Sequence, residues 1–399
     1  MKFKPAILHI ITRLDLGGAQ KSCLALIKEL QTQYPDFEIY LISGTTGPLV
    51  PQAQQLKNVY LLPSLVWEIK PQNLFLEIKN FYLIWQIMRK LKQQHGDLIV
   101  HTHTIKAGVI GRWAALLAGA QTRIHTIHGY AFHPYQNKLV WLSFYLSELI
   151  CSFITTKFIC VSQADLIAGC EIFPRFKQKS SLIRAATVPA ISGNATPQQA
   201  PYLSKLSISS RLPHPTPLYE LHRVRNDVKS LFIIGTIASL KPGKNLFELL
   251  KAFKLACQTC PNLKLEIVGG GPLNQALKDQ ISQLQLAEKV TLVGWAPEPR
   301  KYLQNWQIFA FTSLWEGLPC AIVEAHSLGL PILAYQVGGI GDLVPPEQLY
   351  PIGGWSQLAR GIQALYYKQN PPSSNSLPAD FQIAKMALDH VNLYKTTSL

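Results

Sequence analysis

The sequence predicts an α/β protein with two Rossmann-like domains. Three observations predict this class. Apolar strand-like runs alternate with helical segments, the alternation stops and restarts once, and 399 residues exceed what a single hydrophobic core usually organises. Each half then holds a parallel sheet covered by helices on both faces, and such sheets bind ligands at the carboxyl ends of their strands.

The first half shows the alternation from its opening residues. Short apolar runs typical of buried strands are each followed by a stretch with helical spacing. We therefore assign residues 1–187 to an N-terminal Rossmann-like domain that binds the second substrate. Its predicted strands lie near residues 7–11, 38–43, 97–103 and 122–128, and its predicted helices near residues 17–30, 74–93 and 106–119.

The second half repeats this rhythm after a break. Residues 188–228 are rich in Pro, Ser and Gln without usable periodicity, which predicts a linker or surface excursion. Residues 229–399 form the second predicted domain. The helix predicted at residues 381–395 either closes that domain or packs back on the first one. The other elements are strands near residues 230–238, 263–270, 289–295, 308–313 and 331–337, with a helix near residues 245–257.

Composition narrows the possible partners. Lys and Arg total 38 against 23 Asp and Glu, and this net charge of +15 favours phosphates or an anionic lipid surface. The chain has no long run of basic residues and no basic-aromatic RNA signature, so we expect no nucleic-acid partner. The seven cysteines are scattered, and the opening segment reads as a strand rather than a cleavable leader, so we expect a cytoplasmic protein.

Two apolar segments raise the question of membrane contact. Residues 139–155 are too short to span a bilayer and contain Glu148, so we expect a buried helix, with an interfacial position left open. The helix predicted at residues 74–93 mixes large apolar and basic residues. It fits an anionic membrane face as well as ordinary packing on a sheet. A peripheral position on the inner face of the cytoplasmic membrane is therefore compatible with the sequence.

Two glutamates on either side of a Gly-Leu-Pro turn mark the most informative stretch. Glu316 follows a predicted buried strand, and Glu324 lies on the helix that begins near Ala321. Both carboxylates and the amides of the turn therefore gather at the carboxyl edge of the second sheet. Amides at a helix start point at negative charge, and carboxylates accept hydrogen bonds from hydroxyls. A nucleotide sugar offers both kinds of group.

Four histidines end two neighbouring predicted strands of the first half. His101 and His103 end one strand, and His125 and His128 end the next. Dense histidines raise the possibility of a metal. Alternation along a strand places neighbouring side chains on opposite faces, however, whereas zinc needs ligands that converge on one point. We therefore expect no metal.

These segments together resemble glycosyltransferase family 4, retaining enzymes of the GT-B fold whose two Rossmann-like domains bind substrates in the cleft between them. The most specific part is EGLPCAIVE at residues 316–324 with SLGLPILAYQVGGI at residues 327–340, which is similar to the family's paired-glutamate motif. Residues 101–134 resemble bacterial members that build capsule, exopolysaccharide and lipopolysaccharide chains. The resemblance covers nearly the whole chain apart from the linker.

The resemblance implies a donor site in the second domain. One glutamate and the turn after it contact the donor sugar, a second glutamate holds the ribose hydroxyls, an aromatic residue meets the nucleotide base, and a glycine-rich turn lines the cleft. In this sequence these residues are Glu316, Gly317, Leu318 and Pro319; Glu324; Trp295; and Gly270.

The segment IGTIASLKPGKNLFELLKAF is similar to the family's phosphate-binding strand and loop, with one departure. Ser239 stands where the family usually has arginine. Lys244 is therefore the expected contact of the donor diphosphate, and Lys241 a substitute for the missing arginine. A lysine lacks the bidentate fork of arginine, so this departure weakens the expectation of tight diphosphate binding.

In the first domain the resemblance implies three further features. Gly17 and Gly18 form a loop between the first strand and the first helix, where the backbone can approach a phosphate or acceptor closely. His128 is the expected polar and catalytic group near the donor sugar. Lys106, between a strand end and a helix start, is a candidate contact of an acceptor phosphate.

From these residues we predict a retaining glycosyltransferase that moves a sugar from a nucleotide diphosphate sugar, with UDP-sugar favoured, to a lipid-linked or saccharide acceptor in cell-surface polysaccharide synthesis. The nucleotide sugar is a substrate, and we expect no cofactor. The resemblance implies that Glu316 positions the donor rather than acting as a nucleophile. Two alternatives stay open: a nucleotide-sugar epimerase of the same fold, and a non-catalytic partner subunit, which Ser239 favours.

Overall fold

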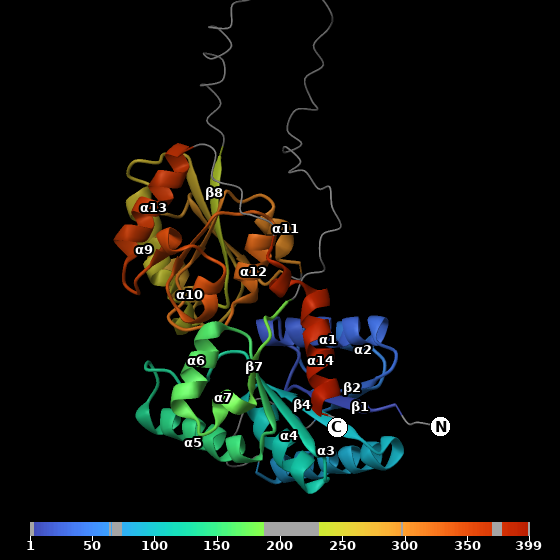
Figure 1. Cartoon of the computed structure of the whole chain (residues 1–399). Coiled ribbons are helices and arrows are strands. Elements are labelled where there is room, and N and C mark those ends of the chain that lie inside the picture. Colours follow the sequence, from blue (N-terminus) through green and yellow to red (C-terminus); the bar gives the residue numbers. More distant parts are fainter. Residues whose placement is uncertain are drawn as a thin grey trace, which may run out of the picture.

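The chain folds into two α/β domains, as predicted from the alternation of strands and helices (Figure 1). The computed structural model describes residues 4–63, 65, 74–186, 231–296, 298–368 and 377–397. The predicted linker at residues 188–228 lies outside the described residues. Each domain is built on a wholly parallel sheet, so the fold class is confirmed.

The first sheet has seven strands in the order β3-β2-β1-β4-β5-β6-β7, and every pair is parallel. Successive strands proceed outward in one direction from β1 and in the other direction from β4. The switch point between β1 and β4 opens a crevice at the carboxyl ends of these strands. The strands are β1 (Ala6–Ile10), β2 (Glu38–Gly44), β3 (Val59–Leu62), β4 (Leu98–His103), β5 (Thr122–Ile127), β6 (Lys157–Cys160) and β7 (Ser180–Leu182).

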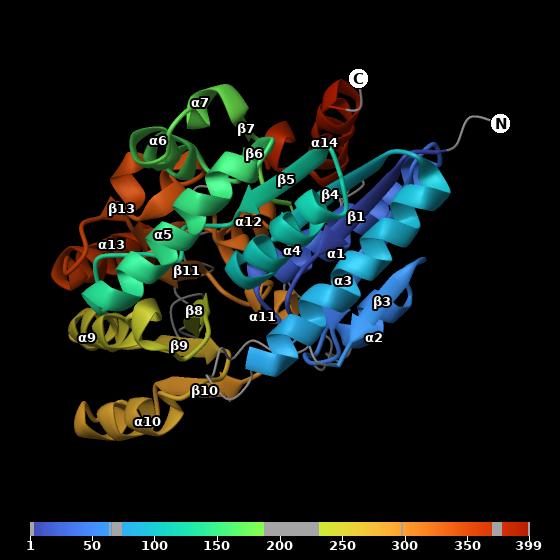
Figure 2. The same ribbon diagram turned by 90° about the horizontal axis from the view of Figure 1, so that it is seen from below.

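Helices cover both faces of the first sheet because its strands alternate apolar side chains between two cores. Ile7 packs in the core beneath α1, whereas Leu8 packs in the core beneath α3 and α4. Figure 2 looks onto α3, α4 and α5, which lie side by side on one face. The helices of this domain are α1 (Gly18–Gln33), α2 (Val50–Gln54), α3 (Leu74–His95), α4 (Ile105–Leu117), α5 (Lys138–Ile154), α6 (Gln163–Ile172) and α7 (Phe176–Lys179).

The second sheet has six strands in the order β10-β9-β8-β11-β12-β13, again all parallel. Its switch point lies between β8 and β11. The strands are β8 (Phe232–Ile237), β9 (Leu263–Val268), β10 (Val290–Gly294), β11 (Ile308–Phe311), β12 (Ile332–Tyr335) and β13 (Leu349–Tyr350). The helices are α9 (Leu246–Ala256), α10 (Asn274–Gln283), α11 (Arg300–Leu303), α12 (Cys320–Ser327) and α13 (Trp355–Lys368).

The last helix, α14 (Ile383–Thr397), packs on the first domain rather than on the second. It lies against α1, and its residues Met386, Val391 and Tyr394 belong to the core beneath α1 (Figure 1). The Tyr394 hydroxyl is also hydrogen-bonded to Nδ1 of His101 at 2.7 Å. The chain therefore returns to the first domain after completing the second, and α14 helps to build the floor of the first domain's site.

Helix α5 is oriented differently from the buried helix that its apolar sequence predicts. Its buried residues include Glu148, whose two carboxylate oxygens accept hydrogen bonds from Nη2 of Arg112 on α4 at 2.9 and 3.0 Å. One face of the helix packs on a core of the first domain through Trp141, Phe144, Tyr145 and Leu149. The opposite face is exposed and also apolar, with Leu139 77% and Phe153 69% exposed. The expectation of a buried helix is therefore wrong for this outer face, while the inner face places Glu148 against the fully buried Arg112 guanidinium. Among the described residues no helix is long and apolar enough to cross a bilayer.

Candidate active site

A cleft of about 770 Å³ lies between the two domains, at the carboxyl ends of both sheets. The first domain contributes the loop after β1, the start of α1 and the end of β5. The second domain contributes the loops after β8, β9, β10 and β11, together with α12. Most of the residues predicted from the sequence line this cleft: Gly17, Gly18, His128, Lys241, Lys244, Gly270, Trp295, Glu316, Gly317, Leu318, Pro319 and Glu324.

Lys106 is the exception among the predicted residues. It lies in the first turn of α4 but is 6% exposed, and its Nζ forms an ion pair with Oε1 of Glu77 on α3 at 2.5 Å. It is absent from the lining of the cleft. Packing of α4 against α3 turns the Lys106 side chain away from the cleft. Its position in the sequence, next to a strand end, did not predict this orientation.

Lys244 and Glu316 lie together on the wall of the second domain. The Lys244 ammonium donates a hydrogen bond to Oε1 of Glu316 and lies 5.6 Å from the centre of the Phe311 ring. Their side chains are 26% and 14% exposed, so both are partly desolvated. Lys244 therefore presents a positive charge held between a carboxylate and an aromatic face, next to the start of α12.

The start of α12 adds a second positive feature. The helix begins after Pro319, whose backbone is extended, and no side chain caps it. Its first-turn amides and the positive end of its dipole therefore face the cleft. Trp295 also lines the cleft, and its side chain is 60% exposed. Its indole packs closely on Gly270, since a Cβ on Gly270 would lie 2.3 Å from the indole nitrogen.

Glu324 is held by a partner that the sequence did not predict. Its carboxylate, 8% exposed, lies 3.3 Å from the Nζ of Lys21, which comes from α1 of the other domain. The two residues are 303 positions apart in the chain. Arg13 and Asp15, which also line the cleft, were missed in the same way. Their place just beside the predicted Gly-Gly loop was the available signal.

The two domains approach each other through glycines. A Cβ on Gly317 would lie 2.6 Å from the carbonyl oxygen of His128 and 2.7 Å from the amide nitrogen of Gly129. Gly18 likewise lies close to the second domain, since a Cβ on Gly18 would lie 2.8 Å from Sγ of Cys320. Backbone therefore faces backbone across the cleft, which brings the His128 side chain next to the Glu316 turn.

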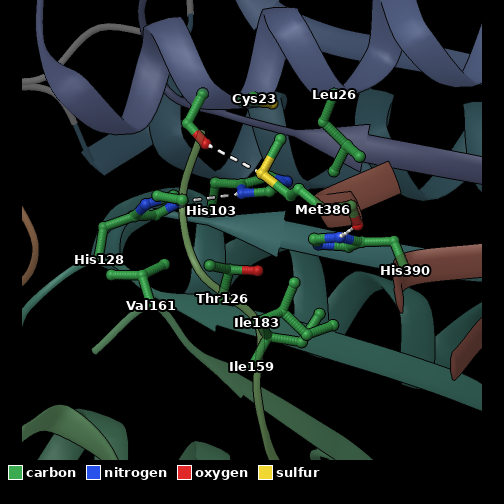
Figure 3. A pocket seen from close by; sticks show the side chains of 12 residues that line it. Cys23, Leu26, His103, Thr126, His128, Ile159, Val161, Ile183, Met386 and His390 are labelled. Carbon is green, nitrogen blue, oxygen red and sulfur yellow. Dashed lines mark hydrogen bonds between the residues drawn. The ribbon is translucent and has the colours of Figure 1, made fainter. Parts of the chain in front are cut away.

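Histidines fill the floor of the cleft beneath His128. Burial, with the nearby His390, lowers the pKa of His128 to about 4, so its ring is neutral at pH 7. Figure 3 shows His103, His128 and His390 around a small cavity that is also lined by Cys23 and Met386. The fold thus gathers histidines from separate elements, since His103 ends β4, His128 follows β5 and His390 lies on α14.

Two family profiles match this chain. The profile described as glycosyl transferases group 1 matches residues 220–377, and the profile described as Glycosyltransferase Family 4 matches residues 16–167. Among curated proteins, the UDP-Gal:alpha-D-GlcNAc-diphosphoundecaprenol alpha-1,3-galactosyltransferase of Escherichia coli is 29% identical over 86% of this chain and 82% of its own. The capsular polysaccharide biosynthesis glycosyltransferase CapM of Staphylococcus aureus is 24% identical over 68% of this chain and 66% of its own.

Solved structures share the fold across nearly the whole chain. Anabaena HepE in complex with UDP-glucose superposes with a TM-score of 0.73 at 17% identity, covering 98% of this chain and 99% of that one. Sucrose-phosphate synthase from Thermosynechococcus elongatus superposes with a TM-score of 0.74 at 17% identity, covering 98% of each chain. These structures share the GT-B fold with this chain, and the profile match shows that the chain is a glycosyltransferase. The chain belongs to the family 4 type of these enzymes, as its resemblance predicts.

Proposed function

We propose that this enzyme transfers a sugar from a UDP-sugar to a lipid-linked acceptor, with retention at the anomeric carbon, in the synthesis of a cell-surface polysaccharide. The observation that carries the proposal is the convergence of Lys244, Glu316 and Glu324 on one wall of the cleft. The names of the relatives support the substrate classes, since one transfers galactose from UDP-galactose to a diphosphoundecaprenol-linked sugar.

The proposed reaction depends mainly on stabilising the leaving group. The bond from the anomeric carbon to the diphosphate breaks, and its electron pair goes to the leaving oxygen. The acceptor hydroxyl bonds to the same face of that carbon, and its proton passes to the leaving phosphate. Lys244 and the amides at the start of α12 stabilise the developing charge because they are already in place and partly desolvated. Glu316 and His128 hold the sugar, and no metal is needed in this scheme.

The decisive experiment offers the purified enzyme UDP-galactose and UDP-glucose together with an N-acetylglucosamine-diphosphate lipid. We expect a new glycolipid whose anomeric configuration, measured by NMR, equals that of the donor. An inverted product would overturn the retaining mechanism. An isomerised nucleotide sugar formed without acceptor would instead establish an epimerase, and nucleotide binding without turnover would establish a non-catalytic subunit.

Replacement of Glu324 by alanine is expected to weaken UDP binding about 100-fold. Each hydrogen bond from a ribose hydroxyl to a carboxylate is worth roughly 1.5 kcal/mol or more, and two are lost. Isothermal titration calorimetry with UDP measures the change. Glu288→Ala is the matched control, because Glu288 is an exposed glutamate of the same domain outside the cleft lining. Equal affinities in the two variants would remove Glu324 from the nucleotide site.

We further propose that the face formed by α3, α4 and α5 rests on the membrane that carries the acceptor. Large apolar side chains stand exposed on all three helices, which lie side by side in Figure 2. They are Phe75, Ile78 and Tyr82 on α3, Leu117 on α4, and Leu139, Leu146, Ile150 and Phe153 on α5. Basic residues of α3, together with the net charge of +15, add attraction to anionic lipid.

The double substitution Ile150→Glu with Phe153→Glu is expected to reduce binding to phosphatidylglycerol vesicles by at least about tenfold. Each buried apolar side chain contributes roughly 1.5 kcal/mol or more to the interfacial binding that is lost. Flotation at low salt measures bound protein. Leu388→Glu serves as the control, since Leu388 is 43% exposed but lies on α14, away from this face. Undiminished flotation of the double variant would exclude α5 as the docking surface.

A further inference from the structure

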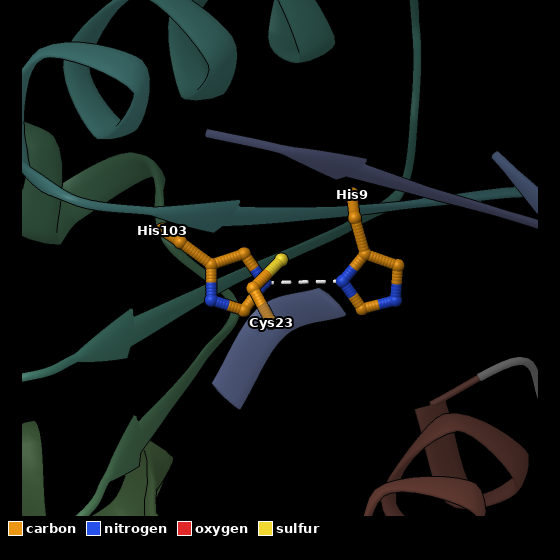
Figure 4. A group of neighbouring side chains, drawn as sticks. All are labelled: His9, Cys23 and His103. Carbon is orange, nitrogen blue, oxygen red and sulfur yellow. Dashed lines mark hydrogen bonds between the residues drawn. The ribbon is translucent and has the colours of Figure 1, made fainter. Parts of the chain in front are cut away.

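Three histidine rings form a hydrogen-bonded chain from the core of the first domain to the cleft. Nδ1 of His9, next to the last residue of β1, lies 3.0 Å from Nε2 of His103 at the end of β4. Nδ1 of His103 lies 3.2 Å from Nε2 of His128. Figure 4 shows the first of these bonds and Figure 3 the second. His9 and His103 are at most 2% exposed, whereas His128 lines the cleft.

All three rings are neutral at pH 7. Burial lowers the pKa of His9 to about 3 and that of His128 to about 4, and it holds the pKa of His103 well below its ordinary value. A neutral ring carries one N–H and one bare nitrogen. His103 therefore donates through one nitrogen and accepts through the other. Both hydrogen bonds must run in the same direction along the chain.

The inner end of the chain decides which direction is favoured. Nε2 of His9 is buried and has no hydrogen-bond partner among the described residues. If His128 donated to His103 and His103 donated to His9 (the inward direction), Nε2 of His9 would carry an N–H without an acceptor. If His9 donates to His103 and His103 donates to His128 (the outward direction), Nε2 of His9 carries no hydrogen. Buried N–H groups without a partner are rarer in proteins than acceptors without one, so the outward direction is favoured.

The same cluster has the composition of a metal site, which is the competing interpretation. Ligand atoms of His9, His103 and Cys23 all lie within 4.8 Å of one another (Figure 4). However, the two facing ring nitrogens already bond to each other. Burial also raises the pKa of the Cys23 thiol, and no cation in the part of the chain that the structure describes offsets that cost, so the thiolate that a metal would need is disfavoured. The hydrogen-bonded chain is the better account.

We propose that His9 and His103 are positioning residues that keep His128 in the Nδ1–H form, so that His128 presents an N–H donor to an oxygen of the donor sugar. The role of this donor rests on the proposed sugar transfer, whereas the tautomer itself does not. In this form His128 binds the sugar as a hydrogen-bond donor, and the nitrogen that could accept a proton is turned into the protein. It is therefore not the base that deprotonates the acceptor.

The experiment is ¹⁵N and ¹³C NMR of protein labelled in histidine, which reports the tautomer of each ring. We expect the Nδ1–H form at His128 in the wild-type protein. This outcome is specific, because free histidine favours the Nε2–H form. In His103→Ala, where water can fill the space of the lost ring and accept a hydrogen bond from Nε2, we expect His128 to change to the Nε2–H form. In the same variant we expect kcat/KM for sugar transfer to fall about tenfold, the loss of one neutral hydrogen bond, with the Kd for UDP unchanged.

Two further variants make the test specific. His125→Phe removes a buried histidine that does not belong to the hydrogen-bonded row of His9, His103 and His128. His125 is instead hydrogen-bonded to Thr102 and packs toward α4, so this variant should leave the His128 tautomer unchanged. His103→Gln, which can both donate and accept, should restore the tautomer and most of the activity. Should His103→Ala fail to fold, the wild-type tautomer still decides the direction.

The inference is overturned by any of three results: an Nε2–H form of His128 in the wild-type protein, a tautomer that His103→Ala leaves unaltered, or stoichiometric zinc bound by Cys23 in the purified enzyme. Failure of the proposed function looks different. In that case UDP-sugar is not turned over while the NMR spectra still report the Nδ1–H form, and the histidine chain stands without the sugar as its ligand.

Discussion

Lys244→Ala is expected to lower kcat for sugar transfer by about 100- to 1,000-fold, the range found when one preorganised group is removed from a developing anion. In the folded enzyme Lys244 is held by Glu316 and by the face of Phe311. Its charge therefore needs little rearrangement when the diphosphate departs. Removing it also leaves Glu316, only 14% exposed, without its partner and close to the phosphates. Both effects act against the leaving group.

Steady-state kinetics with UDP-sugar and acceptor measure this loss, and two lysine variants serve as controls. Lys251→Ala, at an exposed position on α9, should match the wild-type protein. Lys241→Ala should have a smaller effect than Lys244→Ala, since Lys241 lines the cleft but is exposed. If Lys244→Ala kept kcat within about threefold of wild type, another group would have to stabilise the leaving diphosphate, and the role assigned to Lys244 would be wrong.

The second-domain wall of the cleft was predictable because its residues are close together in the sequence. The two glutamates lie on one strand-turn-helix unit, and a parallel strand that ends in a turn must deliver that turn to the carboxyl edge of its sheet. Lys244 follows β8 in the same manner. Local chain geometry therefore determines which edge each residue reaches, without knowledge of the neighbouring domain.

Contacts between distant segments were not predictable in this way. The pair of Lys21 and Glu324 depends on how the two domains face each other, and neither local sequence specifies that angle. The histidine chain likewise requires the β1–β4 pairing, which sets His9 opposite His101 and brings His103 within reach. Alternation along one strand separates neighbours, but it says nothing about side chains supplied by adjacent strands.

The outward face of α5 shows a different limit. Sequence hydrophobicity alone predicts that this helix is buried, yet only one of its faces packs on the core, and Leu139, Leu142 and Leu146 are exposed. The inner face also carries the carboxylate of Glu148, because an unpaired Arg112 guanidinium in the core would be costly. Apolar composition does not show which face of a helix is covered, since apolar residues stand on both faces here.

Gly317→Ala is expected to reduce kcat/KM about 100-fold while leaving UDP affinity nearly unchanged. The added Cβ would lie 2.6 Å from the carbonyl oxygen of His128 and 2.7 Å from the amide nitrogen of Gly129, both backbone atoms that cannot rotate away. The first domain must therefore move back, which takes His128 away from the donor sugar. Displacements of about 1 Å at a reacting centre cost about this much rate. UDP affinity should persist because the groups proposed to hold the nucleotide lie within the second domain.

Gly341→Ala separates this steric effect from a general intolerance of the loop. Gly341 lies in the neighbouring 3-10 turn, Gly338–Asp342, and its Cβ would meet only Leu349 Cδ1 at an ordinary 3.7 Å. Kinetics, UDP titration and thermal unfolding of both variants are the measurements. Loss of activity in Gly317→Ala with normal UDP binding and unfolding would mean that catalysis requires the closed approach of His128 to the Glu316 turn. Wild-type activity in Gly317→Ala would mean instead that the domains react at a wider separation, with His128 too far away to touch the sugar.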